Sequence, residues 1–240
     1  MVLIKTIRTY IFWGATTLIF MPVCILLSFL PEKIRRNRFY YFMTTIWDKL
    51  LVFFTFTLVD VEGKENLPKF PSEPAIIVMN HISSLDIPLI EDLIGTYPHI
   101  WISKASYTKV PFWGILIKRI HVPVQRDNPR KAIQALLRAY NIVKDKDIHI
   151  LIFPEGTRSQ DGKLQKFLGG FGVLAKKLNR PVIPVAISGS NKVMPKKSLM
   201  VSPRASDINM IIGDKFFIGE EEGEKEFVER VRNWFEQKIV

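Results

Sequence analysis

The stretch that decides the fold is AIIVMNHISSLDIPLI, residues 75–90, in which an apolar run gives way to a polar turn and then to a second apolar pattern. Its first five residues predict a buried strand. Pro88 is tolerated only in the first turn of a helix, so we expect a helix to begin near residues 84–86. His81 would then lie in the turn, and Asp86 at the start of the helix.

The spacing of His81 and Asp86 decides whether they can interact. Positions five apart on one continuous helix lie roughly 140° apart and do not meet. Across a turn, the Asp86 carboxylate could bond one ring nitrogen of His81, fix its tautomer and leave the other nitrogen free as a base. The alternative is a capping box formed by Ser83 and Asp86, with His81 an ordinary turn residue. That cap would place Pro88 at the fifth helical position, where its missing N–H matters.

The composition narrows the class of protein. The chain has 240 residues, of which 48% are hydrophobic, so it can form a sizeable core and is not disordered. Its single cysteine excludes an intramolecular disulfide and a paired-cysteine zinc site. A net charge of +11 implies an anionic partner, such as a membrane surface or a phosphorylated substrate. Nucleic acid is not expected, because the basic residues are dispersed and two lipid-like segments precede the rest of the chain.

Two long apolar stretches occupy the N-terminal quarter of the chain. Residues 9–31 carry no charge, and residues 39–59 are interrupted only by Asp48 and Lys49. The first stretch resembles a secretory signal, but no A-x-A-like cleavage site follows it. A hairpin buried in a soluble core is the structural alternative. We predict a membrane-associated two-helix hairpin over residues 1–59, followed by a catalytic domain over residues 60–240.

The hairpin is expected to lie in one leaflet on the cytoplasmic face of the cell membrane. Asp48 and Lys49 would each cost roughly 2.5–3.5 kcal/mol at the centre of a bilayer, whereas at its interface both could reach water. The basic residues of the connecting loop would stay near anionic headgroups; they are Lys33, Arg35, Arg36 and Arg38. A single span by residues 9–31 is the alternative.

Short apolar runs alternate with helical patterns after residue 60. Strands are predicted at 75–79, 100–102, 120–124, 148–153, 182–187 and 209–212, and helices at 88–95, 130–144, 167–178 and 224–237. This alternation predicts an α/β fold with a mixed, largely parallel sheet flanked by helices. The helix at 130–144 is expected to bury one stripe, formed by Ile133, Leu136, Leu137, Tyr140 and Val143.

A second polar cluster follows the apolar run at residues 150–153. It places Glu155, Gly156 and Arg158 at the end of a predicted strand, where open α/β sheets bind their ligands. The guanidinium fork suits phosphate, and a glycine lets the backbone approach a ligand closely. The alternative is a surface turn with a solvated Glu/Arg pair, but it does not explain polar residues beside so apolar a strand.

Other basic and histidine residues are weaker candidates. Lys104 and Arg126 also fall at strand ends, and with Arg158 they could form an oxyanion-binding cluster in one cleft. Residues 110–114 are expected to form a turn. Three histidines within or beside strand patterns are expected to be structural: His99, His121 and His149. The sequence contains no G-x-S-x-G, Walker A or H-E-x-x-H motif.

Four segments, taken together and in this order, resemble the motifs of the glycerolipid acyltransferase family, most closely its bacterial 1-acyl-sn-glycerol-3-phosphate acyltransferases. They are Asn80-His81-x-Ser83-x-x-Asp86, Gly114 with the downstream Arg126, Phe153-Pro154-Glu155-Gly156-Thr157-Arg158-Ser159, and Ile183-Pro184-Val185. The resemblance covers roughly residues 64–190. It implies transfer of a fatty acyl group from a thioester of acyl carrier protein or coenzyme A to lysophosphatidic acid, giving phosphatidic acid, with no metal or cofactor.

The resemblance also implies roles for individual residues. His81 would take the proton of the acceptor hydroxyl, and Asp86 would orient His81. The acceptor would be held by Lys104, Arg126, Glu155, Gly156, Thr157 and Arg158. Supporting motif positions are Asn80, Ser83, Gly114 and Pro184. The alternatives are an acyltransferase for another lysophospholipid or for glycerol 3-phosphate, a lipid hydrolase, and a non-catalytic binder of anionic lipid.

Overall fold

The computed structural model describes residues 2–68, 73–196, 198–202 and 208–239, which form one seven-stranded sheet with helices on both faces. The strands follow the order β1-β7-β6-β2-β5-β3-β4. Every neighbouring pair is parallel except β6 and β7. The predicted fold class, a mixed and largely parallel sheet, is therefore confirmed. The strand bounds are β1 Val59–Glu62, β2 Ile76–Met79, β3 His99–Lys104, β4 Val122–Val124, β5 His149–Ile152, β6 Val182–Ser188 and β7 Ile208–Ile212.

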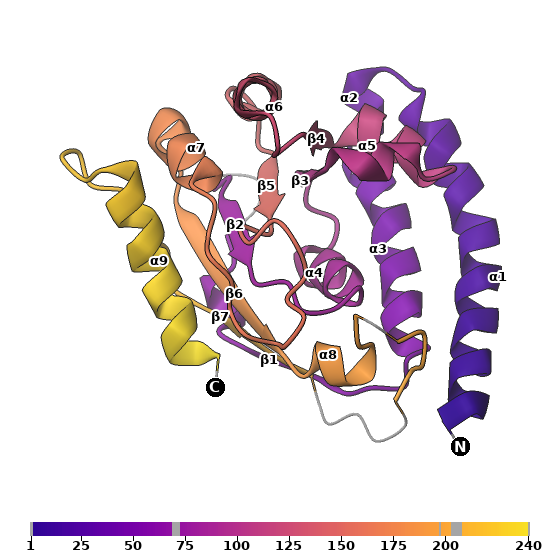
Figure 1. Cartoon of the computed structure of the whole chain (residues 1–240). Helices are drawn as coiled ribbons and strands as arrows, with labels where there is room; N and C mark the ends of the chain where they lie inside the picture. Colours follow the sequence, from indigo (N-terminus) through magenta and orange to yellow (C-terminus); the bar gives the residue numbers. More distant parts are fainter. Residues whose placement is uncertain (1, 69–72, 197, 203–207, 240) are drawn as a thin grey trace.

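The helices form one layer on each side of the sheet (Figure 1). Helices α6, α7 and α9 cover one face, while α4 and α3 cover the other, with α1 outside α3. The α-helices are α1 Val2–Ser28, α2 Glu32–Arg35, α3 Arg38–Phe53, α4 Asp86–Ile94, α5 Trp113–Ile120, α6 Pro129–Val143, α7 Gly170–Leu178, α8 Ser190–Val193 and α9 Glu224–Lys238. Two 3-10 turns, η1 Lys64–Asn66 and η2 Ala105–Lys109, complete the described elements.

The central strand β2 shows why its sequence is continuously apolar. Ile76 and Val78 point into the core beneath α6, α7 and α9, whereas Ile77 and Met79 point into the core beneath α4. Successive residues of a strand face opposite sides, so a strand covered on both faces buries every side chain. This burial fixes β2 at the centre of the sheet, and its carboxyl end delivers the polar turn that follows.

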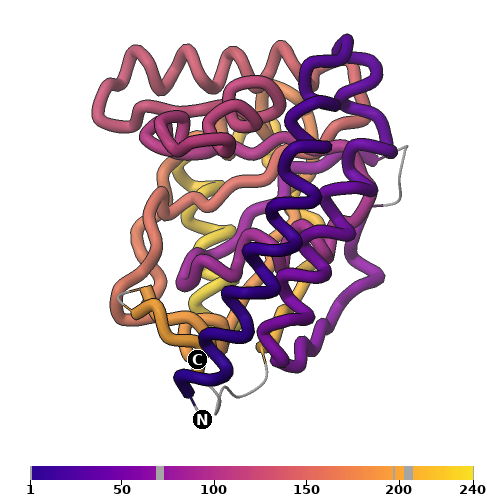
Figure 2. Tube along the Cα trace, turned by 90° about the vertical axis from the view of Figure 1, so that its right-hand side faces the viewer, coloured from indigo at the N-terminus to yellow at the C-terminus, as the bar shows by residue number. Residues whose placement is uncertain are grey.

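The two N-terminal helices pack against the α/β layers (Figures 1 and 2). Helix α3 lies between α1 and α4. Apolar residues of α1, α3 and α5 form one buried cluster. Helix α1 presents exposed apolar side chains outward, including Leu18, Ile19 and Leu26. Within the described ranges, α1 is the one helix long and apolar enough to cross a membrane.

Two polar residues of the N-terminal segment point inward, contrary to expectation. Asp48 is buried, because consecutive helical positions differ by about 100° and its neighbour Lys49 is the one that faces solvent, beside Asp92. Arg36 is also buried and lies 3.4 Å from Glu32. The prediction that these two side chains reach water or headgroups is wrong.

Several element boundaries and faces also differ from expectation. The stripe predicted for α6 is partly wrong, because Ile133 is 58% exposed and Leu137 44%, while Ala135 and Ala139 face the core beside Val143. Helix α5 occupies residues expected to be a turn and the start of a strand, and β1 was not predicted. The turn expected at residues 110–114 rests on Pro111 and Gly114, but proline can also precede a helix, and Gly114 lies within α5, where it packs closely on the Thr108 backbone.

Candidate active site

The His81 ring and the Asp86 carboxylate meet across the turn after β2. The distance between His81 Nδ1 and Asp86 Oδ2 is 2.8 Å. An Nδ1–H that donates to the carboxylate leaves the lone pair of a neutral ring on Nε2. Helix α4 begins at Asp86, with Pro88 as its third residue, as predicted. The turn therefore provides a base held in one tautomer by a carboxylate.

The same carboxylate organises the backbone of the turn. Oδ2 of Asp86 accepts hydrogen bonds from the backbone N–H groups of Ile82 and Ser83, both at 2.7 Å. The bond from Ser83 is the one that the acidic residue makes in a capping box. The other half of a capping box is missing, because Leu85 is the N-cap residue of α4 and the Ser83 hydroxyl accepts from the Leu85 N–H. The capping-box alternative is therefore wrong.

The loop after β5 holds the backbone of His81 from both sides. Glu155 Oε1 accepts from the His81 N–H at 2.7 Å, and the Ser159 N–H donates to the His81 carbonyl at 2.8 Å. The other Glu155 oxygen accepts from the Gln165 N–H at 2.9 Å. Burial raises the pKa of Glu155, against the opposing effect of the two amide donors. Both Glu155 oxygens are thus bonded within the loops, which places this side chain in the framework of the site.

An aromatic stack fixes the plane of the His81 ring. Phe153 stacks on His81 with 3.9 Å between ring centroids and 14° between planes. Trp101 stacks in turn on Phe153 at 5.2 Å, and its indole N–H donates to Glu91. The His81 ring is thereby held on one face by Phe153 and at Nδ1 by Asp86.

The predicted basic residues are only partly brought together. Arg126 is half-buried, and its guanidinium lies so close to Gly156 that a Cβ at that glycine would collide with it. Burial lowers the pKa of Arg126, with the nearby Tyr107 and Asp127 opposing the shift. Arg158 donates to the Ser84 hydroxyl beside the His–Asp turn.

Lys104 and Thr157 are more peripheral. Lys104 is exposed and pairs in register with Val124, two residues before Arg126. Thr157 is exposed on the loop after β5. Neither is bonded to His81 or Asp86, so their predicted contacts to an acceptor stay predictions.

The four motif-support residues all have packing or bonding roles. Asn80 bonds the N–H and C=O of Ile187 in β6, at 2.7 and 2.9 Å. Ser83 donates to the Met194 carbonyl at 2.9 Å. A Cβ at Gly114 would collide with the Thr108 backbone, and Pro184 lies buried in β6 beside β2. The bonds of Asn80 and Ser83 hold the turn after β2 against β6 and the segment that follows it.

One residue close to the pair was missed from the sequence. The Ser190 hydroxyl donates to Asp86 Oδ1 at 2.6 Å, across 104 residues of chain. Ser190 lies two residues after the end of β6, at the start of α8, so the rule that polar residues near strand ends gather at one edge could have found it. In the sequence, Ser190 is marked only by the dipeptide Gly189-Ser190, and Gly-Ser is common in loops.

The remaining histidines are structural. His149 Nδ1 accepts from the Ala75 N–H, His121 Nδ1 accepts from the Trp101 N–H, and His99 bonds Glu91. Burial lowers the pKa of His121 to about 3 and that of His149 to about 4. In the described part of the chain, no three His, Cys, Asp or Glu side chains gather as a metal site would require.

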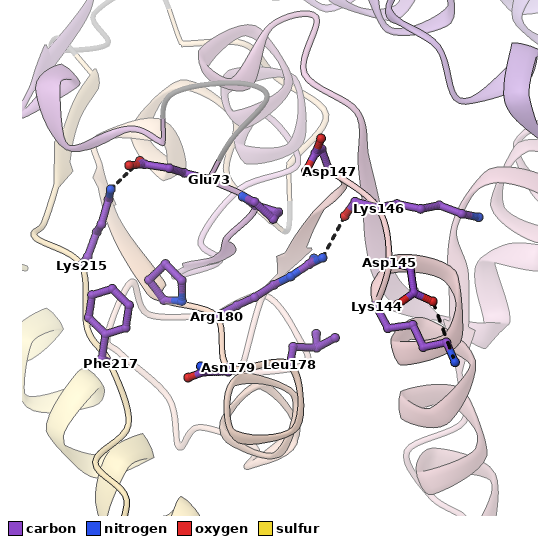
Figure 3. A pocket seen from close by; sticks show the side chains of 12 residues that line it. Glu73, Lys144, Asp145, Lys146, Asp147, Leu178, Asn179, Arg180, Lys215 and Phe217 are labelled. Atoms are coloured by element: carbon purple, nitrogen blue, oxygen red, sulfur yellow. Dashed lines mark hydrogen bonds and ion pairs between the residues drawn. The ribbon is translucent and has the colours of Figure 1, made fainter.

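A cavity of about 490 Å³ lies away from the His–Asp turn (Figure 3). Its charged side chains are largely engaged within the protein. Lys215 pairs with Glu73, and Arg180 donates to three backbone carbonyls: those of Val143, Lys146 and Ile148. These contacts close the amino ends of the strands and indicate a structural role for the cavity wall.

The fold and the His–Asp turn together match one family. Residues 58–188 match the family model described as Acyltransferase, which covers β1 to β6, and the chain belongs to that family.

Individual relatives carry a narrower name. The chain is 35% identical to the chloroplastic 1-acyl-sn-glycerol-3-phosphate acyltransferase BAT2 of Brassica napus, over 68% of this chain and 46% of that protein. It is 31% identical to the 1-acyl-sn-glycerol-3-phosphate acyltransferase of Cocos nucifera, over 90% of this chain and 68% of the relative. The chain spans about half the length of its chloroplastic relatives.

A solved structure is similar over nearly its whole length. The crystal structure of the 1-acyl-sn-glycerophosphate acyltransferase PlsC from Thermotoga maritima superposes with a TM-score of 0.79 at 27% identity, covering 99% of this chain and 95% of that one. The match therefore includes the N-terminal helices as well as the sheet.

Proposed function

We propose that this chain is a 1-acyl-sn-glycerol-3-phosphate O-acyltransferase, which converts lysophosphatidic acid to phosphatidic acid in phospholipid biosynthesis. The observation that carries the proposal is the 2.8 Å contact between His81 Nδ1 and Asp86, which leaves Nε2 as the base. The names of the relatives support the same acceptor.

The reaction needs no nucleophile from the protein. His81 Nε2 takes the proton of the acceptor hydroxyl as its oxygen attacks the thioester carbonyl carbon. The C–S bond then breaks, and the imidazolium returns the proton to the leaving thiolate. Asp86 stabilises the imidazolium between these steps. The donor is a thioester of acyl carrier protein or coenzyme A, and Arg126 and Arg158 hold the acceptor phosphate.

The proposed site of action is the cytoplasmic face of the cell membrane. Helix α1 presents its apolar side to one leaflet, while α3 stays between α1 and the α/β layers. The overall positive charge of +11 favours an anionic surface. This arrangement holds the His81 turn near the surface where a lysolipid resides.

The test is mass spectrometry of products from the purified full chain. Lysophosphatidic acid, a lysolipid with a larger headgroup and glycerol 3-phosphate are each offered with an acyl carrier protein or coenzyme A thioester. We expect phosphatidic acid from lysophosphatidic acid, and a loss of about 10²–10⁴-fold in turnover for His81→Ala. Asp86→Asn should also lose much of the activity, because it permits the wrong tautomer.

The controls separate the proposal from its alternatives. Lys131→Ala, on the exposed side of α6, should keep full activity, and thermal unfolding should show that all variants fold. Fatty acid released without any acceptor would indicate a hydrolase instead. Lipid binding without product, unchanged by His81→Ala, would indicate a non-catalytic binder.

A further inference from the structure

The Asp86 carboxylate is fully buried, and each of its oxygens is bonded by a different part of the chain. Oδ2 contacts the His81 ring and accepts from the N–H groups of Ile82 and Ser83. Among the residues that the structure describes, Ser190 is the one hydrogen-bond donor to Oδ1. A buried carboxylate oxygen without a donor is costly, so this single hydroxyl is well placed to control the ionised state of Asp86.

Ser190 is held in place from both sides along the chain. Before it, Ile187 is bonded twice by the Asn80 side chain. After it, the Met194 carbonyl accepts from the Ser83 hydroxyl. Ser190 itself is fully buried. These bonds tie the segment after β6 to the turn after β2, so the Ser190 hydroxyl has a fixed position relative to Asp86.

We propose that Ser190 is a positioning residue for acyl transfer. By donating to Oδ1, it stabilises the ionised carboxylate and fixes its plane, so that Oδ2 faces His81 Nδ1. Ser190 acts through Asp86, and the proposal rests on the proposed function because His81 is taken there as the base. Its expected signature is a change in how the His–Asp pair responds to pH, which a residue needed only for packing would not produce.

Other charged groups near the pair are arranged differently. Glu155 accepts from the backbone N–H of His81, and its negative charge also acts on Asp86. Arg158 bonds the Ser84 hydroxyl, and Lys196 donates to the Arg158 carbonyl. None of these three side chains donates a hydrogen bond to Asp86, so removal of the Ser190 hydroxyl leaves their contacts intact.

The first experiment compares turnover of lysophosphatidic acid by the full chain and by Ser190→Ala across a range of pH. We expect turnover to fall by about 10-fold or more, since losing one hydrogen bond to a charged group costs about 10- to 150-fold, with the acceptor Michaelis constant unchanged. Without its donor, the ionised carboxylate binds a proton within the pair more readily. The acidic limb of the pH–activity profile should therefore move up by about one unit.

Two further variants serve as controls. Ser190→Thr retains the hydroxyl and should restore the profile of the parent. Ser28→Ala makes the same change at an equally buried serine, whose hydroxyl donates to the Ile25 carbonyl in α1, and should leave the profile unchanged. Thermal unfolding of each variant shows whether it folds, and if threonine does not fit, the alanine variant decides alone.

A second readout does not depend on catalysis. Diethylpyrocarbonate modifies neutral imidazole, and peptide mass spectrometry can follow its addition to His81 at a series of pH values. The pH of half-modification should move upward in Ser190→Ala. If it stays where it is in the parent, or if turnover is unchanged, the proposal is wrong. If the parent makes no phosphatidic acid, the proposed function fails, and this readout still decides whether Ser190 acts on the pair.

Discussion

The orientation of His81 depends on contacts to both its ring and its backbone. Asp86 Oδ2 holds the ring at Nδ1, and Phe153 lies parallel to its face at 3.9 Å. Glu155 and Ser159 bond the backbone of the same residue. In the proposed reaction, a base held at so many points would lose little entropy when the acceptor arrives, which would favour reaction in the bound complex.

The two arginines near the turn should govern recognition of the acceptor phosphate. Charge-assisted hydrogen bonds contribute roughly 1.5–3 kcal/mol each, so Arg126→Ala and Arg158→Ala should each raise the acceptor Michaelis constant about 10- to 150-fold. Both should also narrow the preference for a phosphate over a neutral headgroup. Steady-state kinetics with paired lysolipids measures both effects. Arg130→Ala, an exposed arginine at the start of α6, is the matched control. If both variants prefer a phosphate over a neutral headgroup as strongly as the parent does, the acceptor phosphate does not bind at these arginines.

The polar residues of the site differ in how readily the sequence reveals them. His81 and Asp86 lie five positions apart, and Pro88 marks the helix start, so local rules predict their meeting. The bond from Ser190 depends instead on the neighbouring positions of β2 and β6 in the sheet. No local pattern encodes that neighbour relation. The framework role of Glu155 was likewise hidden, because its partners are two backbone N–H groups, that of His81 across 74 residues of chain and that of Gln165 ten residues further on.

At the scale of single elements, α3 carries a buried acid on its inner face. Burial holds the pKa of Asp48 well above its usual value of 3.8, and the negative charges of Glu91 and Asp92 add to the effect. The pKa of this carboxyl group is higher in the folded chain than in the unfolded chain. Such a group stabilises the fold at pH values below its pKa in the unfolded chain, and this contribution is lost as the pH rises through its pKa in the folded chain. The buried acid therefore contributes less to the stability of the fold as the pH rises above the usual pKa of an aspartate.

Asp48→Asn should consequently stabilise the protein at pH 8. Each kcal/mol gained raises the midpoint of thermal unfolding by about 2–4 °C in a chain of this size. The gain should shrink as the pH is lowered toward 4, where the parent carboxyl is protonated. Calorimetry in detergent at several pH values measures it. Asp145→Asn, on a side chain that is 82% exposed, should change the midpoint little at any pH. A lower midpoint for Asp48→Asn at pH 8 would contradict the argument.

The elements that sequence reasoning assigned well are those with strong apolar periodicity. Helix α9 was expected at 224–237 and is found at Glu224–Lys238. For α6 the extent was right and the buried face was right in part. Val143 is buried and Leu136 and Tyr140 pack against the core, whereas small alanines face the sheet while Ile133 and Leu137 point outward. Hydrophobicity alone ranks isoleucine above alanine, whereas close approach of a helix to a sheet favours the smaller side chain.

At the scale of the whole molecule, the outer position of α1 bears on how the protein meets a membrane (Figure 2). Helix α3 packs against α4, so a protein in which α1 and α3 both crossed the membrane would have to break that contact. Helix α1 is apolar and largely exposed. This arrangement favours a protein that rests on one leaflet with α1 as its contact surface.

Cysteine labelling in intact cells tests this orientation. Single cysteines replace Lys5 or the exposed Lys33 in a background lacking Cys24, and a membrane-impermeant reagent is added. Neither position should react until the membrane is permeabilised. Reaction at Lys5 alone would establish a single span by α1, and reaction at Lys33 alone a double span. A cysteine at the exposed Asp145 reports on which side of the membrane the α/β layers lie, and it should also react only after permeabilisation.

The long chain separations across the site have a consequence for how the protein folds. His81 is joined to Glu155 across 74 residues, Asp86 to Ser190 across 104, and Asn80 to Ile187 across 107. Contacts between such distant segments carry a high loop-closure entropy and form late in folding. The His–Asp pair therefore acquires its fixed geometry only after β5 and β6 have docked beside β2. In the proposed reaction, a nascent or partly folded chain would consequently have no competent base, and its first turnover would mark the completion of the central sheet.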